Sequence, residues 1–334
     1  MKNDNPKISV IMPSYNEINY IEECIESVVN QTLTDIEIIC VDGESDDGTL
    51  DVLKKYAQKD SRIQVFTSDK KSYGNQVNIG FSKSSGKYIS IIETDDFIEK
   101  DMLETLYDLS ENGTVDIIKS SFYHYDDSDK ENPKISMDND KENLPTNISF
   151  TLKEEPNFVF GHPSIWAGIY RREFLEENNI KMIEEKGGGW VDNPFFYETA
   201  ILAKSIRYIH KAFYYYRESN PDSSSNTFDD FSLPIKRVND MYDIFDKYGY
   251  VCEEVKFLFY FRLFRYIEII LENNDFNFLN LDKEICFAIH DVLEKVDEDL
   301  VKYRMPNGFK KLYYKLISPL FLMRFEENTN YEVV

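Results

Sequence analysis

Basic residues are scarce in this sequence. The chain of 334 residues has 38 Lys and Arg against 61 Asp and Glu, which gives a formal net charge of -23. Proteins that bind DNA or RNA rely on Lys and Arg to neutralise phosphates. The composition therefore argues against a broad nucleic-acid-binding surface, and we expect no nucleic-acid partner.

Cysteine is also rare. The four cysteines lie far apart in the sequence and form neither a metal knuckle nor a disulfide framework. The N-terminal residues MKNDNPKISV lack the apolar segment of a signal peptide, and no stretch is apolar over the length that a membrane-spanning helix needs. We therefore expect a cytoplasmic protein.

The glycine-rich motifs that commonly bind phosphate are missing as well. No GxGxxG follows the first predicted strand, and no GxxxxGK[ST] occurs anywhere in the chain. This excludes a dinucleotide fingerprint and a P-loop. A bound diphosphate would have to be held in another way, for which a divalent cation such as Mg²⁺ or Mn²⁺, gripped by one or two carboxylates, is suited.

The first part of the chain alternates between two hydrophobic patterns. Four short runs rich in Ile and Val predict strands that are covered on both faces, at residues 7–13, 36–42, 63–68 and 88–93. Segments with helical spacing separate them, which predicts βαβ units and a doubly wound α/β domain. The length, together with 42% hydrophobic residues, favours about two domains.

A polar cluster follows each of the four predicted strands. The clusters are PSYNE (13–17), DGESDDGT (42–49), the turn at 68–74 and ETDD (93–96). Ligands bind at the carboxyl ends of the strands in such sheets, so the clusters predict one shared crevice. An N-cap role for Ser45 or Asp47 remains an alternative for the second cluster.

The ETDD cluster places three carboxylates almost next to one another. Like charges at this spacing repel unless a proton or a cation lies between them. The cluster of Glu93, Asp95 and Asp96 therefore indicates a divalent metal site if the groups converge, and a solvated acidic turn if they do not.

Two segments carry a resemblance to a known family. Residues 8–49, from ISVIMPSYNE to DGESDDGT, followed by SSGKYISIIETDDFI, resemble the nucleotide-sugar-binding half of family-2 glycosyltransferases with a GT-A-type fold. Residues 162–225 resemble the acceptor half of bacterial members that build capsular, lipopolysaccharide or protein-linked glycans. The resemblance implies a GT-A-type domain over 1–230, with a nucleotide-sugar half at 1–123 and an acceptor half at 149–230.

The resemblance also implies roles for individual residues. Those expected to bind the nucleotide sugar are Pro13, Tyr15 and Glu17 at the base and ribose, Asp42 at the uracil ring, and Asn78, Glu93 and Thr94. Asp95 and Asp96 would bind the metal, Mn²⁺ or Mg²⁺. The sequence departs from the family pattern at Glu93, where relatives have Asp, and at Val77, where many relatives have an Arg that contacts the diphosphate.

Four residues of the second half complete the expected site. Asp192 in GGGWVDNPF occupies the position of the catalytic base, although it also suits a helix cap, with Pro194 in the first turn. Arg217 would either close over the diphosphate or pair with a surface carboxylate. Trp190 and His162 are candidates for acceptor contact, and each has a structural role as its alternative.

The last hundred residues, 231–334, show helical apolar spacing and predict a C-terminal helical domain. Within it, FKKLYYKLISPLFLMRF (309–325) is basic in an otherwise acidic protein. Such a segment suits three partners: an anionic membrane, its own helical bundle or a second subunit. A peripheral position at the inner face of the membrane and a homo-oligomer are therefore both open.

Two functions of different class follow from these features. The first is an inverting, metal-dependent glycosyltransferase that moves a hexose or N-acetylhexosamine from a UDP-sugar to a glycan acceptor, either a lipid-linked saccharide or a glycoprotein. The second is a catalytically silent nucleotide-sugar-binding or scaffolding subunit, in which the changes at Glu93 and Val77 mark a loss of activity.

Overall fold

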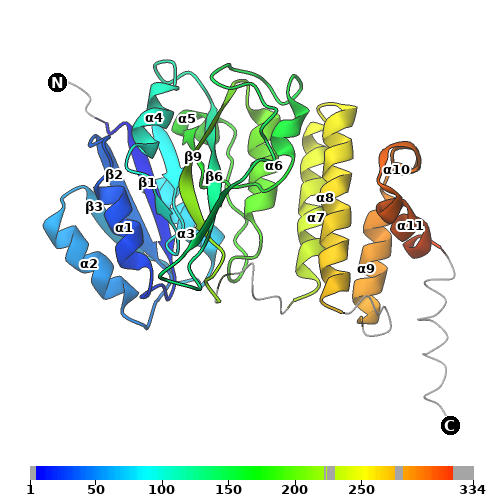
Figure 1. The fold of residues 1–334 in the computed structure, drawn as a ribbon, viewed down its shortest axis with the longest axis horizontal. Coiled ribbons are helices and arrows are strands. Elements are labelled where there is room, and N and C mark those ends of the chain that lie inside the picture. Colours follow the sequence, from blue (N-terminus) through cyan, green and yellow to red (C-terminus); the bar gives the residue numbers. More distant parts are fainter. Residues whose placement is uncertain (1–4, 222, 224–229, 275–280, 319–334) are drawn as a thin grey trace, which may run out of the picture. The chain divides into compact units, whose positions relative to one another are not determined.

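A computed structural model describes residues 5–221, 223, 230–274 and 281–318. The chain divides into two compact units, Met1–Thr227 and Phe228–Val334, and Figure 1 shows that the first is built on a sheet and the second from helices. The predicted class, an α/β domain followed by a helical region, is confirmed.

The sheet of the first unit has nine strands. Its order is β3-β2-β1-β4-β8-β6-β9-β5, and β7 pairs with β6 beside this path. The four predicted strands form its parallel part as β1 (Ile8–Ser14), β2 (Ile36–Asp42), β3 (Ile63–Thr67) and β4 (Tyr88–Ile91). Strand β4 ends two residues before the end of the predicted strand 88–93, so Glu93 belongs to a turn outside the sheet.

Three helices connect the parallel strands, as the periodicity predicts: α1 (Ile21–Val29), α2 (Thr49–Lys59) and α3 (Tyr73–Lys83). The apolar stripe of α1 is buried, because its residues recur at helical spacing on one face. Helix α3 approaches the sheet closely at Gly80, where an added Cβ would lie 2.4 Å from the Ile11 side chain. Larger residues are excluded there.

Antiparallel and mixed pairings extend the sheet. The additional strands are β5 (Phe97–Ile98), β6 (Ile117–Asp126), β8 (Gly168–Arg171) and β9 (Ile206–Arg217). Three helices and a 3-10 turn accompany them: α4 (Met102–Asp108), α5 (Arg172–Glu177), α6 (Asp192–Leu202) and η1 (Pro156–Val159). Strand β9 pairs with β6 over most of its length and with β5 near its end.

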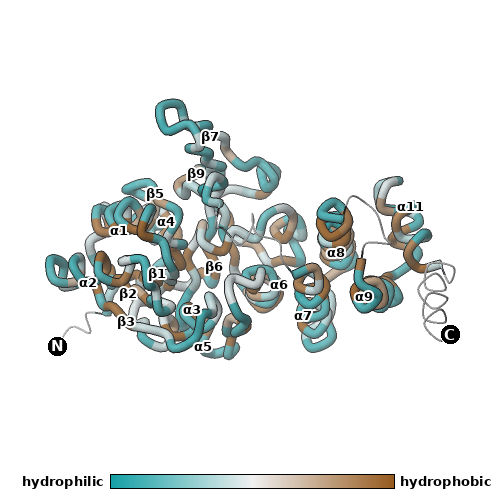
Figure 2. The backbone as a smooth tube through the Cα atoms, turned by 90° about the horizontal axis from the view of Figure 1, so that it is seen from below, coloured by the Kyte–Doolittle hydropathy of each residue, from teal (hydrophilic) through white to brown (hydrophobic). Residues whose placement is uncertain are grey.

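The acidic stretch after β6 contains a strand that the sequence pattern did not reveal. Strand β7 (Lys134–Met137) pairs antiparallel with the end of β6 and is exposed along its whole length. Figure 2 shows the hydrophilic loop beside it standing out from the sheet. Because neither face of β7 is buried, its sequence needs no alternation of apolar and polar residues.

The second unit consists of helices over its described residues. They are α7 (Leu233–Tyr248), α8 (Glu253–Glu272), α9 (Lys283–Glu294), α10 (Glu298–Arg304) and α11 (Asn307–Leu316). Residues 309–316 of the basic segment bury an apolar face within this unit, and Phe309 stacks on Phe264 with ring centres 5.2 Å apart. Residues 319–325 of the same segment lie outside the described residues.

No helix among the described residues is both long enough and apolar enough to cross a bilayer.

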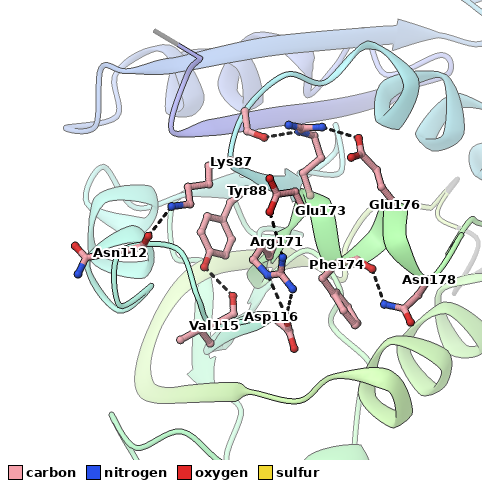
Figure 3. Close-up of polar contacts among 12 residues, drawn as sticks. Lys87, Tyr88, Asn112, Val115, Asp116, Arg171, Glu173, Phe174, Glu176 and Asn178 are labelled. Atoms are coloured by element: carbon pink, nitrogen blue, oxygen red, sulfur yellow. Dashed lines mark hydrogen bonds and ion pairs between the residues drawn. The ribbon is translucent and has the colours of Figure 1, made fainter. Parts of the chain in front are cut away.

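A buried carboxylate joins the beginnings of β6 and β9 to the end of β8 in the first unit. Asp116 precedes β6, and its Oδ1 accepts hydrogen bonds from Nε and Nη2 of Arg171, at the end of β8, over 3.0 and 2.7 Å. Its Oδ2 accepts from the backbone N–H of Lys204, just before β9. Figure 3 shows Arg171 between Asp116 and Glu173, and Glu173 is the exposed partner of the two.

We expect Asp116→Ala to lower the free energy of unfolding by roughly 3 kcal/mol, because it leaves the largely buried Arg171 guanidinium without its main partner. Glu173→Ala is the matched control, since it removes only an exposed partner of the same guanidinium and should cost no more than about 0.5 kcal/mol. Urea denaturation followed by circular dichroism measures both. Equal losses would show that Asp116 has no special part in joining the strands.

A histidine ties the other end of β6 to its neighbours. Nδ1 of His124 lies 2.7 Å from Oε1 of Glu218, which follows β9, and Nε2 lies 3.5 Å from Oδ2 of Asp138, which follows β7. Hydrogen bonding to Asp138, and also to Glu218, raises the pKa of His124 to about 9. The imidazolium therefore holds two strand ends to β6 at neutral pH.

This pKa predicts a pH-dependent stability. Because the folded-state pKa lies above the ordinary value of about 6.5, the stabilisation is present below that value and is lost as the pH rises through about 9. We expect His124→Gln to melt at a lower temperature than the unmodified protein at about pH 6 and to approach it at about pH 9.5. A constant difference between the two melting temperatures would contradict the assignment.

Candidate active site

The polar clusters after β1 and β2 are joined by a set of hydrogen bonds. The backbone N–H of Asn16 donates to Ser45 Oγ, and the side chain of Asn16 exchanges hydrogen bonds with Asp46. The N–H of Glu17 donates to Thr49 Oγ1 at the start of α2. The loops PSYNE and DGESDDGT therefore form one wall, as expected of strand ends that face the same crevice.

Asp42 lies at the base of this wall and is fully buried. Its carboxylate accepts hydrogen bonds from the backbone and the hydroxyl of Ser45, and Ser14 Oγ lies 3.4 Å from Oδ2. Both serine hydroxyls are local to the two loops, and Ser45 orients Asp42. The alternative of an N-cap is wrong for Ser45 and Asp47, because the N-cap of α2 is Gly48; Asp47 Oδ1 instead accepts from the backbone N–H of Thr49, the first residue of the helix.

Tyr15 stands at the rim of the crevice with 40% of its surface exposed. Lys71, from the turn after β3, donates to the Tyr15 hydroxyl over 2.8 Å and places its ammonium 4.7 Å from the ring centre. Pro13 is buried, and its carbonyl accepts from Thr94 Oγ1 over 3.0 Å. Thr94 therefore ties the ETDD turn to the wall made by the first two loops.

The three carboxylates of ETDD converge. One oxygen from each of Glu93, Asp95 and Asp96 lies within 4.8 Å of the others. Burial raises the pKa of Glu93 well above its usual range, and the nearby charges of Asp95 and Asp192 raise it further. Burial also raises the pKa values of Asp95 and Asp96. The cluster is thus a site where negative charge is costly.

Strand β9 and the residues after it surround this turn. The Tyr214 hydroxyl donates to Asp96 Oδ2 over 2.7 Å, and the backbone N–H of Arg217 donates to Asp96 Oδ1 over 2.7 Å. Asn220 Nδ2 donates to Asp95 Oδ2 over 2.9 Å. The sequence did not predict Tyr214 and Asn220 as site residues. They reach the turn through the pairing of β9 with strands more than a hundred residues away, and no local sequence pattern reveals such pairing.

Arg217 is buried rather than open to the crevice, with 2% of its side chain exposed. Its Nε donates to the carbonyl of Asp95, and its two Nη atoms form ion pairs with Glu23 and Asp127. In this arrangement the guanidinium holds the ETDD turn against α1 and the end of β6. A contact with a diphosphate would need at least one of these partners to be released.

The expected base lies close to the same carboxylates. Asp192 is the first residue of α6, and its charge contributes to the raised pKa values of both Glu93 and Tyr73. Tyr73 in turn donates to Glu93 Oε1 over 3.2 Å. The cap residue before Asp192 is Val191, whose side chain makes no capping hydrogen bond. Asp192 thus stands in the first turn of α6, on the side of the carboxylate cluster.

The glycine loop before Asp192 is partly ordered by the turn after β3. The N–H of Gly187 donates to the carbonyl of Lys71, and the N–H of Tyr73 donates to the carbonyl of Gly187. Trp190 is half-buried and has a positive φ of 52°. Only a few per cent of residues other than Gly adopt this conformation, so the loop is held by its surroundings.

Two further candidates have structural partners. The side-chain amide of Asn78 donates to the carbonyl of Met182 and accepts from its N–H, which joins α3 to the segment before the glycine loop. His162 is half-buried, and its Nδ1 accepts from the backbone N–H of Ser164. Its ring lies 5.5 Å from that of Tyr216, so it belongs to an aromatic cluster on the side of β9.

The chemistry of the donor set fits a divalent cation. Mg²⁺ and Mn²⁺ prefer oxygen ligands, and a positive ion would offset the repulsion among the three carboxylates. Glu93 and Asp95 are half-buried, whereas Asp96 is 1% exposed and both its oxygens already accept hydrogen bonds from β9. Glu93 and Asp95 are therefore the residues of this group that can turn an oxygen towards an added ion.

Comparison with known proteins gives several matches. The chain is 30% identical over 220 residues to the uncharacterized glycosyltransferase EpsJ of Bacillus subtilis, which covers 65% of this chain and 62% of EpsJ. It is 29% identical over 327 residues to the cholesterol galactosyltransferase of Borreliella burgdorferi, which covers 92% and 89% of the two chains. The match to the glycosyltransferase GlyA of Streptococcus pneumoniae spans only 30% of that relative.

Solved structures match the fold across both units. TarS of Staphylococcus aureus, solved with UDP-GlcNAc, superposes with a TM-score of 0.73 at 20% identity, over 98% of this chain and 93% of that one. The mannosyltransferase PcManGT of Pyrobaculum calidifontis, solved with GDP-Man and Mn²⁺, gives a TM-score of 0.51 at 13% identity. At these identities the likeness establishes the GT-A-type fold.

A family assignment follows from the sequence itself. Residues 9–178 match the model described as Glycosyl transferase family 2, a span of about half the chain that contains every strand-end cluster of the crevice. The class of enzyme that the resemblance implied, a glycosyltransferase, is thereby confirmed. The chain belongs to glycosyl transferase family 2.

Proposed function

We propose that the protein is an inverting, metal-dependent glycosyltransferase, which moves a hexose or N-acetylhexosamine from a UDP-sugar to a glycan acceptor. The observation that carries the proposal is the convergence of Glu93, Asp95 and Asp96, near enough to Asp192 of α6 for the charge of Asp192 to raise the pKa of Glu93. Two carboxylates that hold a metal and a third that acts as a base are what such a transfer needs.

The nucleotide would lie along the wall formed by the first two loops. Tyr15 has an exposed ring on which a base can stack. Asp42 would accept the N–H of a uracil ring only if a loop movement uncovers its carboxylate and releases a hydrogen bond from Ser45. Pro13, Glu17 and Thr94 would line the base and ribose. The solved complexes of TarS with UDP and with UDP-GlcNAc support a uridine nucleotide as the first choice.

The diphosphate would lie against Glu93 and Asp95. A Mg²⁺ or Mn²⁺ ion there would stabilise the negative charge that develops on the leaving diphosphate. The chain's own contribution is to hold the two carboxylates at a fixed spacing and, through Tyr73, to orient Glu93. To contact the nucleotide sugar, Asn78 would have to break its hydrogen bond to the carbonyl of Met182, and Arg217 would have to break an ion pair such as that with Glu23.

Asp192 would accept the proton of the acceptor hydroxyl as that oxygen attacks the sugar. A single carboxylate suffices for inversion, because the nucleophile enters opposite the leaving group. The position in the first turn of α6 favours the ionised form, since the N-terminal end of a helix carries partial positive charge.

The acceptor would enter beside Trp190 and His162. A lipid-linked saccharide or a glycoprotein fits the proposed reaction, which would take place in the cytoplasm or at the inner face of the membrane. The similarity to a cholesterol galactosyltransferase over 92% of the chain adds a sterol to the acceptors that should be tried.

One observation favours the alternative, a catalytically silent nucleotide-sugar-binding subunit. Val77 is completely buried within α3, so the position at which many relatives carry an Arg cannot reach a diphosphate here. A silent subunit would bind the donor and never release its sugar. Binding and turnover must therefore be measured separately.

We expect Asp95→Ala to abolish metal-dependent binding of the nucleotide, because it removes a carboxylate from the metal site. Asp192→Asn should leave binding intact and lower the transfer rate at least about a hundredfold, since it removes the base and keeps the shape. Isothermal titration with UDP, GDP and their sugar conjugates, with Mn²⁺ and with chelator, measures binding. Release of UDP measures transfer.

Equal loss of nucleotide binding in both variants would contradict the separate roles of Asp95 and Asp192. Donor binding by the unmodified protein without hydrolysis or transfer, across lipid-linked, protein and sterol acceptors, would favour the silent subunit. No binding of any nucleotide sugar with either metal would refute the proposed function itself.

A further inference from the structure

We propose that Tyr214 is a positioning residue, whose hydroxyl fixes the ETDD turn and thereby sets the affinity of the site for its cation. The proposal rests on the proposed function, since it concerns the same metal site. In this proposal Asp96 holds the turn in place and is not a metal ligand.

The Tyr214 hydroxyl makes two hydrogen bonds to opposite ends of the turn. It donates to Asp96 Oδ2 over 2.7 Å and accepts from the backbone N–H of Glu93 over 3.1 Å. The side chain is fully buried, so water cannot replace either bond. One oxygen atom therefore fixes the distance between the first and the last residue of the cluster.

Asp96 is engaged on both sides by β9. Its second oxygen accepts from the backbone N–H of Arg217 over 2.7 Å, and the residue is 1% exposed. A cation could take an Asp96 oxygen only by breaking one of these two bonds in a place that solvent does not reach. The carboxylate instead secures the turn, which leaves Glu93 and Asp95 to face the ion.

The ring of Tyr214 is itself held in place. It stacks on Trp166 with ring centres 4.1 Å apart and an angle of 23° between the planes, and Trp166 is 2% exposed. The segment before Trp166 is fixed by the buried Lys119, whose Nζ donates to the carbonyl of Pro163 over 2.6 Å. The hydroxyl therefore sits on a rigid support and cannot follow the turn if the turn moves.

Groups that orient metal ligands change metal affinity when they are removed, typically by 10- to 100-fold. We expect Tyr214→Phe to weaken Mn²⁺ binding, measured by titration in the presence of UDP, by a factor in this range. Amide hydrogen exchange at residues 93–96 of the metal-free protein should become faster, because the N–H of Glu93 loses its acceptor. Neither readout depends on turnover.

Tyr215→Phe is the matched control. Tyr215 is the next residue of β9, and its hydroxyl also donates to a carboxylate, Glu99 Oε1, over 2.6 Å, but outside the cluster. The Tyr215→Phe variant should bind Mn²⁺ with the same affinity as the unmodified protein, and the amide hydrogens of residues 93–96 should exchange at the same rate. Thermal melts of both variants show whether each remains folded.

Asp96→Asn provides a second variant that keeps the shape of the anchor. Its amide oxygen can still accept from the N–H of Arg217, and its NH₂ can donate to the Tyr214 oxygen. We expect its Mn²⁺ affinity to stay within about tenfold of the unmodified protein, a smaller loss than the 10- to 100-fold of an orienting group. Asp95→Ala should bind no Mn²⁺ at all.

The outcomes separate this inference from the proposed function. Unchanged Mn²⁺ affinity in Tyr214→Phe, or an equal loss in Tyr214→Phe and Tyr215→Phe, would overturn the positioning role while the metal site stands. Loss of Mn²⁺ binding in Asp96→Asn to the extent seen in Asp95→Ala would make Asp96 a ligand and overturn its part as an anchor. Absence of Mn²⁺ binding by the unmodified protein would refute the metal-dependent function, and this inference with it.

Discussion

Three carboxylates at the end of a buried strand form the interaction on which the rest of this site depends. Glu93, Asp95 and Asp96 converge within 4.8 Å, and burial raises the pKa of each. Without a cation or hydrogen-bond donors such a cluster is unfavourable, because the like charges repel one another and the carboxylates lose their hydration. The surrounding residues can offset this cost by donating hydrogen bonds to the carboxylates, and residues of β9 and the segment after it do so.

The donors come from a part of the chain that is remote in sequence. Tyr214, the backbone of Arg217 and Asn220 each donate to the turn, and they all lie at the end of β9 or just after it. Strand β9 can reach the turn because it pairs with β5, which follows the turn directly. The geometry of the ETDD turn therefore depends on residues 214–220, which lie more than a hundred positions later in the sequence.

The sequence predicted those parts of the structure that depend on local pattern. The four parallel strands and the helices between them follow from runs of Ile and Val and from helical spacing, and the shared crevice follows from the direction of the strands. Strand β7 escaped prediction because it buries neither face. The partners of Asp96 could not be predicted, because the register of β9 is set by its pairing with strands that are distant in the sequence. Arg217 was a candidate for binding the diphosphate because arginine suits that role, but its location places it in buried ion pairs with Glu23 and Asp127.

Preorganisation explains why so much of the first unit surrounds one turn. In the proposed reaction, a metal and a base would have to keep their positions while the sugar passes from the diphosphate to the acceptor oxygen, so small displacements of a carboxylate would slow the transfer. Glu93 is oriented by Tyr73, and the turn by Tyr214, while Asp192 is carried by α6, whose residues are mostly buried. The carboxylates that would react therefore stand on elements whose own positions are fixed by the core. The glycine loop before Asp192 is held as well, because the N–H of Gly187 donates to the carbonyl of Lys71 and the carbonyl of Gly187 accepts from the N–H of Tyr73.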